Sequence, residues 1–281
     1  MAKYPIAKEY VPRVPSVPFV MLYYHIFKNA GSTVEYGFGR ALGERFATLH
    51  GPDVASFLLA NPEITAISSH HLEISKAGRA RDPRVRSLPA QEPLNRLWSM
   101  YKHFLRSDPA GALSTKAKGM QRKQFFDFLL EDHPHLVNDV MVNVLANGGD
   151  YTRPQDSRDC AEALKITRGV SVLGVIELFD ENLVPANYFL RPAFPTSRLD
   201  YVGQNVSPEG FRLREEVGDA IYWRLQEVNR LDRKLVSWAR GEVCPRFKLI
   251  PARRQGRSCF ANVAAARTRN VTALDASTLR E

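Results

Sequence analysis

The residues best suited to chemistry near the start of the chain are one lysine, two hydroxyl side chains and a glycine that lie close together. They belong to the segment Lys28, Asn29, Ala30, Gly31, Ser32 and Thr33. A short loop that opens a helix has backbone N–H groups without backbone acceptors, and these groups can converge on an anion. The lysine adds a positive charge, and the hydroxyl groups add donors. The segment therefore predicts a cradle for a phosphate or sulfate ester.

A pair of histidines is the second candidate for chemistry. His70 and His71 follow a short apolar run, Ile64–Ser68, that we expect to form a strand. Polar groups just beyond the carboxyl end of a strand are where open α/β sheets bind ligands. A histidine has a pKa near neutrality and can accept a proton from a hydroxyl group. Either histidine is therefore a candidate general base.

The elements that must position these groups alternate between strands and helices. The apolar run Phe19–Ile26 predicts a buried strand before the loop, and Val34–Leu42 predicts a helix after it, capped by Ser32 or Thr33. Glu92–Leu105 has proline in its first turn and apolar residues at steps of three and four, which indicates a half-buried helix. This order predicts an α/β fold, a P-loop-like three-layer sandwich with a central, mostly parallel sheet.

The rest of the chain is expected to add two strands and several helices. The strands are Val85–Gln91, interrupted by a proline, and Val170–Ile176, with a charged loop over residues 79–86 and a surface loop over residues 106–123. Helices are expected at Gly51–Ala60, Gln124–Glu131, Leu136–Ala146, Asp156–Thr167 and from Glu177 onward. An apolar stripe from Leu213 to Trp238 predicts one long helix that packs on the sheet.

Length and charge indicate how the chain is divided. With 281 residues, of which 44% are hydrophobic, it suits one large α/β domain. Prolines predict an extended arm over residues 1–18, and the apolar pattern ends at Val243, so we expect a domain at 19–243 and a disordered basic tail at 244–281. The tail carries most of the net charge of +9. The body is then not basic enough to predict nucleic-acid binding.

Composition also bears on compartment and metal. No apolar run is long enough for a membrane span, and we expect no signal peptide, because no uninterrupted apolar h-region precedes the first strand. The three cysteines, Cys160, Cys244 and Cys259, are widely spaced, which fits a reducing compartment and gives no metal cluster. These features predict a cytoplasmic protein, with a bacterial cytoplasm favoured, and no bound metal.

Several stretches resemble, in order, the motifs of sulfotransferases that use 3′-phosphoadenosine 5′-phosphosulfate (PAPS). His25–Thr33 resembles the 5′-phosphosulfate loop of the carbohydrate branch, which is related to the heparan sulfate 2-O-sulfotransferases. Ser69–His71 resembles the segment that supplies the base, and Gln91–Ser99 resembles the 3′-phosphate motif. Later blocks at residues 174–181 and 205–208 also agree. The resemblance spans Phe19 to Val243.

This resemblance implies transfer of a sulfuryl group from PAPS to a hydroxyl group of a saccharide or saccharide-bearing acceptor, without a metal. It implies that Lys28 stabilises the leaving phosphate and that His70, slightly favoured over His71, is the base. The residues implied to bind the nucleotide are Lys28 to Thr33, Gln91, Ser99, Asn205 and Ser207. Loops at residues 106–123 and 147–158 are candidates for the acceptor pocket.

One departure from the family pattern keeps two alternatives open. Gln91 stands where the family usually has arginine, and a neutral amide is a poorer partner for a phosphate than a forked cation. Arg96, Arg86 and Arg84 are candidate substitutes. The departure motivates a catalytically weakened nucleotide- or glycan-binding module as the alternative. A small-molecule P-loop kinase is a further one, although the order of lysine and glycine differs from a Walker A loop.

Overall fold

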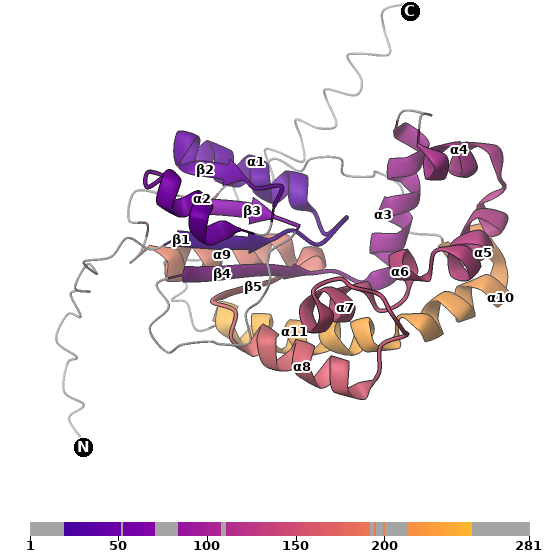
Figure 1. Cartoon of the computed structure of the whole chain (residues 1–281). Coiled ribbons are helices and arrows are strands. Elements are labelled where there is room, and N and C mark those ends of the chain that lie inside the picture. The colour runs from indigo at the N-terminus through magenta and orange to yellow at the C-terminus, as the bar shows by residue number, and fades with distance from the viewer. Residues whose placement is uncertain are drawn as a thin grey trace, which may run out of the picture.

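The fold is organised around a five-stranded, all-parallel sheet in the strand order β2-β3-β1-β4-β5 (Figure 1). The structure is a computed structural model that describes residues 20–51, 53–70, 84–107, 111–191, 194, 199 and 213–248. The strands are β1 (Val20–Tyr24), β2 (Phe46–Thr48), β3 (Ala66–Ser69), β4 (Arg84–Ala90) and β5 (Val172–Val175). Helices cover both faces of the sheet, so the predicted three-layer α/β architecture is confirmed.

Strand β1 shows how the sheet separates two cores. Successive side chains of a strand point to opposite faces, so Met21 and Tyr23 are buried on one face and Leu22 and Tyr24 on the other. Helices α1 (Gly31–Leu42) and α9 (Phe179–Leu190) cover the first face, and α2 (Val54–Ala60), α7 (Val140–Asn147), α8 (Ser157–Arg168) and α11 (Arg230–Lys248) cover the second. Burial on both faces explains why the strand reads as a continuous apolar run.

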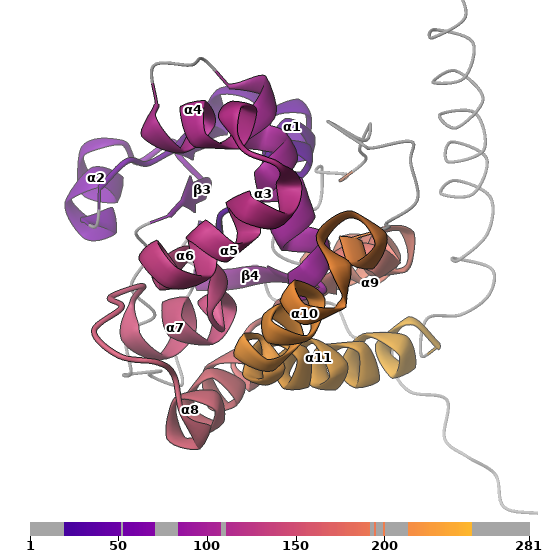
Figure 2. The same ribbon diagram turned by 90° about the vertical axis from the view of Figure 1, so that its right-hand side faces the viewer.

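A second group of helices lies to one side of the sheet (Figures 1 and 2). It consists of α3 (Pro93–Arg106), α4 (Ala112–Gly119), α5 (Arg122–Asp132), α6 (Pro134–Val137) and α10 (Leu213–Val228). These helices have a core of their own, which includes Leu97, Met100, Phe125 and Leu213. Because α3 begins directly after β4, this helical group adjoins the carboxyl ends of the strands.

The strand order creates a switch point between β1 and β4. The chain leaves β1 toward β2 and β3 on one side and returns to β4 on the other side. In open parallel sheets such a point forms a crevice at the carboxyl ends of the strands, where ligands bind. The segments that follow β1, β3 and β4 therefore meet at one edge, and they contain the loop 25–30, His70 and Gln91.

Pro89 lies inside β4, although β4 has a neighbouring strand on each side. Proline lacks the N–H group that a central strand needs on both sides. The pairing of β4 with β1 ends at Ser87. Beyond that point the side-chain amide of Asn29 donates to the carbonyl oxygen of Pro89 at 3.1 Å. A loop side chain thus takes the place of the strand partner and ties the loop to β4.

The start of α1 differs from the prediction. The helix begins at Gly31 rather than at Val34, and its N-cap residue is Ala30, which has no side-chain cap. Ser32 and Thr33 lie in the first helical turn, so the prediction that one of them caps the helix is wrong.

Other boundaries also differ. Residues 106–123 contain α4 rather than one loop. The sequence did not predict this helix, because its buried residues, Ser114 and Ala117, are too few and too small to give an apolar pattern. Strand β4 starts at Arg84, inside the predicted charged loop. The predicted helix Leu136–Ala146 is divided into α6 and α7 at Asp139, whose φ is 41°.

The predicted long C-terminal helix is interrupted twice: α10 has a break at Gly218, whose φ is 75°, and α10 and α11 are separated at Asn229. This residue is fully buried, and its Nδ2 donates to the carbonyl oxygen of Leu225 at 2.8 Å. Only α11 packs on the sheet, whereas α10 packs on α3 and α5. Helix α11 continues past Val243 to Lys248. The predicted arm 1–18 and the tail beyond Lys248 lie outside the described residues.

Candidate functional site

The loop after β1 has an uncommon backbone conformation. Lys28 has a φ of 67° and Ala30 a φ of 53°, so two residues with side chains occupy the left-handed region. Such conformations cost free energy and cluster at functional sites. Asn29 lies between them and is fully buried, and its carbonyl oxygen accepts from the Tyr23 hydroxyl group at 3.5 Å. Hydrogen bonds to Tyr23 of β1 and Pro89 of β4 therefore hold the loop in this strained backbone conformation.

The N-terminus of α1 retains open donors. The N–H groups of Thr33 and Val34 donate to the carbonyl oxygen of Ala30 at 3.0 and 3.2 Å. Within the described part of the chain, the N–H groups of Gly31 and Ser32 donate to no backbone carbonyl. Ser32 is exposed. Unpaired N–H groups at a helix N-terminus can bind an anion, so this geometry is compatible with the predicted cradle.

Two groups on α3, His103 and Arg106, lie beside the loop, and Arg106 adds positive charge there. The ring of Phe27 meets the ring of His103 edge-on, with the ring centroids 5.7 Å apart. Burial and then the charge of Arg106 lower the pKa of Lys28. Burial and then the charges of Lys28 and Arg106 lower the pKa of His103. Among the described residues, no carboxylate forms an ion pair with Lys28 or Arg106. An anion bound here would relieve this repulsion.

Ser99 lies on the same face of α3 as His103, since residues four apart lie one helical turn apart. It is half-buried. Ser99, His103 and Arg106 therefore form a polar stripe along one face of the helix, and His103 and Arg106 place that stripe beside the loop. This position suits a second anionic group on the same ligand.

Gln91 follows β4 and is 9% exposed. Its Oε1 is buried and has no hydrogen-bond partner among the described residues. Arg96 does not replace the missing arginine, because it is 1% exposed and its NH2 donates to the carbonyl oxygen of Leu136 in α6 at 3.0 Å. Arg84 and Arg86 lie in β4, and their side chains lie outside the described part of the structure.

Four polar side chains form a cluster between α1 and the ends of β1 and β3. The Nδ1 atom of His25 lies 2.9 Å from the Oε1 atom of Glu35. The same oxygen accepts from the hydroxyl group of Ser68 at 2.5 Å. The ring of His70 stacks on that of His25 with centroids 3.9 Å apart and an angle of 28° between the planes. The predicted base His70 is therefore connected to a carboxylate through a second histidine.

Gly31 makes room for the ring of His25. A Cβ atom at residue 31 would lie 1.7 Å from the Nε2 atom of His25. The φ of Gly31 lies outside the left-handed region, so close approach and not backbone conformation demands the glycine. The ring of His25 is thus confined by Gly31 at its tip, by Glu35 at Nδ1 and by His70 on one face.

Glu35 and Ser68 were not predicted as site residues, and His25 was predicted only as the start of a motif. A histidine at a strand end and a glutamate in the second turn of the next helix form a usable signal. Ser68 could not be found without the pairing of β1 and β3, which sets Tyr23 opposite Ser68. The predicted residues His71, Asn205 and Ser207 lie outside the described part of the chain.

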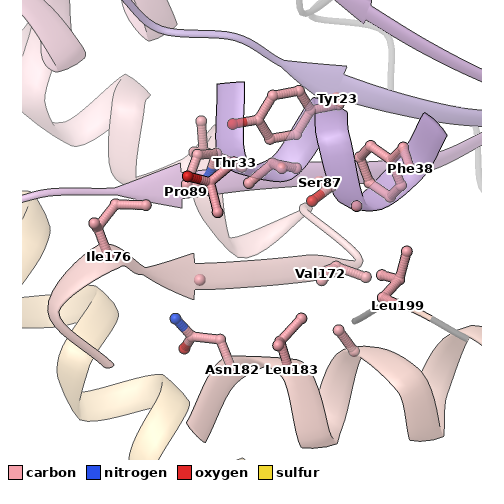
Figure 3. Close-up of a pocket in the computed structure, with 15 residues that line it drawn as sticks. Tyr23, Thr33, Phe38, Ser87, Pro89, Val172, Ile176, Asn182, Leu183 and Leu199 are labelled. Carbon is pink, nitrogen blue, oxygen red and sulfur yellow. The ribbon is translucent and has the colours of Figure 1, made fainter. Parts of the chain in front are cut away.

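An apolar cavity of about 70 Å³ lies beside the loop, between α1 and α9 (Figure 3). Tyr23, Thr33 and Phe38 line one side, and Leu183 and Asn182 line the other. The Nδ2 atom of Asn182 donates to the carbonyl oxygen of Val175, whereas its Oδ1 is buried without a described partner. The cavity suits a flat apolar group with a donor at one edge.

Glu177 has a structural position at the same edge of the sheet. Its Oε1 accepts from the N–H group of Glu92 and from the side-chain amide of Asn95, both at 3.0 Å. Its Oε2 lies 3.3 Å from NH2 of Arg240. Glu177 therefore holds the first turn of α3 against α11, which sets the direction of the polar stripe.

The described residues contain no group of three or more His, Cys, Asp or Glu side chains arranged to hold a metal ion. None of their helices is both long and apolar enough to cross a membrane.

Comparison with known proteins places the chain in no family. No known family model matches it. A protein of Archaeoglobus fulgidus, described only as an uncharacterized protein, is 22% identical over 245 residues, which cover 78% of this chain and 94% of that protein. Similarity over nearly that whole protein indicates a shared domain.

Proposed function

We propose that the protein is a sulfotransferase that moves a sulfuryl group from PAPS to a hydroxyl group of a saccharide or saccharide-bearing acceptor. The observation that carries the proposal is the anion site at the start of α1. Its N–H groups have no backbone acceptor among the described residues, and Lys28 and Arg106 lie near it without a described carboxylate partner. The resemblance of His25–Thr33 to the 5′-phosphosulfate loop supports a phosphosulfate as the ligand.

The roles of the residues follow from charge. Lys28 and the N–H groups of Gly31 and Ser32 stabilise the negative charge that develops on the leaving phosphate. His70 takes the proton from the acceptor hydroxyl group as its oxygen bonds to sulfur and the bond from sulfur to the phosphate oxygen breaks. Ser99 binds the 3′ phosphate, and Gln91 adds a neutral donor. This chemistry requires no metal.

The cavity between α1 and α9 is the proposed place of the adenine ring. It is apolar and lies next to Thr33, at the end of the anion site, and the unpaired Oδ1 of Asn182 suits an exocyclic amino group. Residues 205–207, predicted to bound the nucleotide, follow in sequence after Leu199, which lines the cavity.

We also propose that the protein works in a reducing compartment, a bacterial cytoplasm, because its three cysteines are widely spaced.

A thermal-shift titration without metal tests the proposal with 3′,5′-ADP, the nucleotide product, compared with 5′-AMP and ATP. Binding to the folded state raises the melting temperature with increasing ligand. We expect a shift for 3′,5′-ADP that Lys28→Ala abolishes. Lys165→Ala is the matched control, because Lys165 is exposed and pairs only with Glu162 on α8. The absence of a shift for 3′,5′-ADP would overturn the proposed function.

Turnover separates this proposal from the alternatives. A weakened binding module, which Gln91 favours, would bind 3′,5′-ADP or a glycan but transfer no sulfuryl group from PAPS to any acceptor. In that case Gln91→Arg should tighten binding of 3′,5′-ADP by about tenfold, since a charged, forked donor replaces a neutral one. A kinase would instead show a thermal shift with ATP that depends on Mg²⁺.

A further inference from the structure

The cluster of His25, Glu35, Ser68 and His70 contains a carboxylate that the proposed reaction does not yet use. Glu35 lies in the second turn of α1, and Ser68 lies in β3. The Oε1 atom of Glu35 accepts two hydrogen bonds, from His25 at 2.9 Å and from Ser68 at 2.5 Å. A carboxylate held by two donors, one just after β1 and one in β3, is fixed in place, so its charge has a defined position relative to His70.

Glu35 is ionised in this setting. Burial by itself raises the pKa of Glu35, but the hydrogen bonds from His25 and Ser68 and the nearby histidines outweigh it, so the pKa is lowered. An ionised carboxylate accepts only, and therefore Nδ1 of His25 carries a proton. In the neutral ring, Nε2 is then the acceptor, and it points at Gly31 rather than away from the helix. His25 is thus positioned as a link and not as the base.

Among the described residues in ring contact or hydrogen bonding with His25 or Glu35, Tyr23 and Ser68 are neutral. Tyr23, on β1, has its ring centroid 5.9 Å from that of His25. Burial and then the charge of Glu35 raise the pKa of Tyr23, so its hydroxyl group stays neutral. Ser68 on β3 is neutral, and His70 is the remaining titratable group that faces the ring. Among the described residues, Glu35 therefore supplies the negative charge next to His25 and His70.

We propose that Glu35 and His25 are positioning residues for His70: Glu35 holds the ring of His25, His25 supports the ring of His70 by stacking, and the charge of Glu35 stabilises the imidazolium of His70. The inference rests on the proposed function. When the acceptor O–H bond breaks, its proton moves to His70, the acceptor oxygen bonds to sulfur, and the electrons of the sulfur–oxygen bond leave with 3′,5′-ADP. The positive charge formed on His70 is then balanced by Glu35 across the stacked ring.

The test compares wild type with Glu35→Gln, which keeps an acceptor oxygen for His25 and Ser68 but removes the charge. Histidine labelled with ¹³C at Cε1 reports the titration of His70 by NMR without substrate. We expect the pKa of His70 to fall by about one unit in Glu35→Gln, because an opposite charge favours the protonated ring. Glu44→Gln, an exposed carboxylate just after α1, is the control and should leave the titration unchanged.

Turnover of PAPS gives the second readout. The acidic limb of kcat/KM reports the base of the free enzyme, and it should move to lower pH in Glu35→Gln by the same amount as the NMR titration. Ser68→Ala keeps the charge and should shift both curves by less. An unchanged pKa of His70 in Glu35→Gln would overturn the inference. A shifted pKa in a protein without turnover would overturn the proposed function while supporting the charge coupling.

Discussion

Two of the helix N-terminal regions in this molecule meet charged groups with opposite results. At the start of α1, the N–H groups of Gly31 and Ser32 have no backbone acceptor among the described residues, and Lys28 and Arg106 lie nearby. Where α7 and α11 begin, each helix end is filled by an aspartate that lies at the start of the other helix. The first place is open to a ligand, and the second is closed by the protein itself.

The closed junction is built from Asp139 and Asp232, which are both buried. The carboxylate of Asp232 accepts from the N–H groups of Met141 and Val142 at 3.0 and 2.8 Å. That of Asp139 accepts from the N–H groups of Leu231 and Asp232, both at 2.9 Å. Helix donors satisfied in this way stabilise the packing of α7 on α11 and leave no room for an anion. N–H groups without an acceptor beside Lys28, and not a helix N-terminus by itself, therefore distinguish the candidate site.

The largest effect should come from opening the closed junction. Asp232→Ala removes the acceptor for two buried N–H groups and a carboxylate whose charge interacts favourably with Arg96. We expect a loss of about 3 kcal/mol in the free energy of unfolding, measured by urea denaturation. Asp219→Ala is the control, because Asp219 forms only an exposed ion pair with Arg214 and should change stability little. Equal losses of unfolding free energy in the two variants would show that the buried hydrogen bonds of Asp232 stabilise the protein no more than an exposed ion pair does.

Gly31→Ala tests whether the open site depends on close packing. The added Cβ would lie 1.7 Å from Nε2 of His25, so the ring must move. We expect a loss of about 2 kcal/mol in the free energy of unfolding. Gly39→Ala in the same helix meets no atom within 4 Å and should instead stabilise the protein by about 0.5–1 kcal/mol. Stabilisation by both alanines would contradict the contact between His25 and Gly31.

The closed junction should also make stability depend on pH. Burial, together with the charge of Asp232, raises the pKa of Asp139 from 3.8 to about 7. Burial likewise raises that of Asp232 to about 6. Between pH 4 and pH 7 the folded protein therefore binds more protons than the unfolded chain, so the free energy of unfolding falls as the pH rises.

We expect this fall to exceed about 1.4 kcal/mol, the equivalent of one pKa unit. Urea denaturation at pH 5 and pH 8 measures it. Asp139→Asn keeps an acceptor oxygen without a titrating group, and its stability should change less between the two pH values. Parallel curves for wild type and Asp139→Asn would mean that Asp139 does not titrate in this range.

The smallest effect should come from relieving the strained loop. Ala30 has a φ of 53°, which glycine adopts without the steric cost that a Cβ atom incurs. Ala30→Gly should therefore raise the free energy of unfolding by about 1 kcal/mol. Ala41→Gly, inside α1, should lower it by about 1 kcal/mol. Thermal denaturation of both variants would reveal the opposite signs, and a loss in Ala30→Gly would argue against the left-handed conformation.

The sequence predicted the parts of the site that depend on neighbouring residues. The loop Lys28–Thr33 could be found because a strand, small residues and a helix follow one another within a short stretch. The helix α3 could be found from its apolar spacing and from Pro93 in its first turn. His70 could be found because it follows a strand. In each case the signal is local in the chain.

The parts that were missed depend on contacts between distant segments. The bond between Ser68 and Glu35 requires the register of β3 beside β1. The burial of Arg96 could not be foreseen, because its acceptor is a carbonyl group of Leu136 in a different helix. The break between α10 and α11 also escaped, since the apolar spacing continues through it while Asn229 turns the chain.

The strand order has a consequence for how the protein is made. Strand β1 is the first described strand of the chain, but it pairs with β3 and β4 and not with β2, which follows it. During synthesis from the N-terminus, β1 can pair with β3 first, but its other edge has no partner strand until Arg84–Ala90 has left the ribosome. Pairing between distant segments slows folding and exposes nascent strands to aggregation. The loop after β1, whose Asn29 donates to the carbonyl oxygen of Pro89, can therefore reach its final conformation only after β4 has been made.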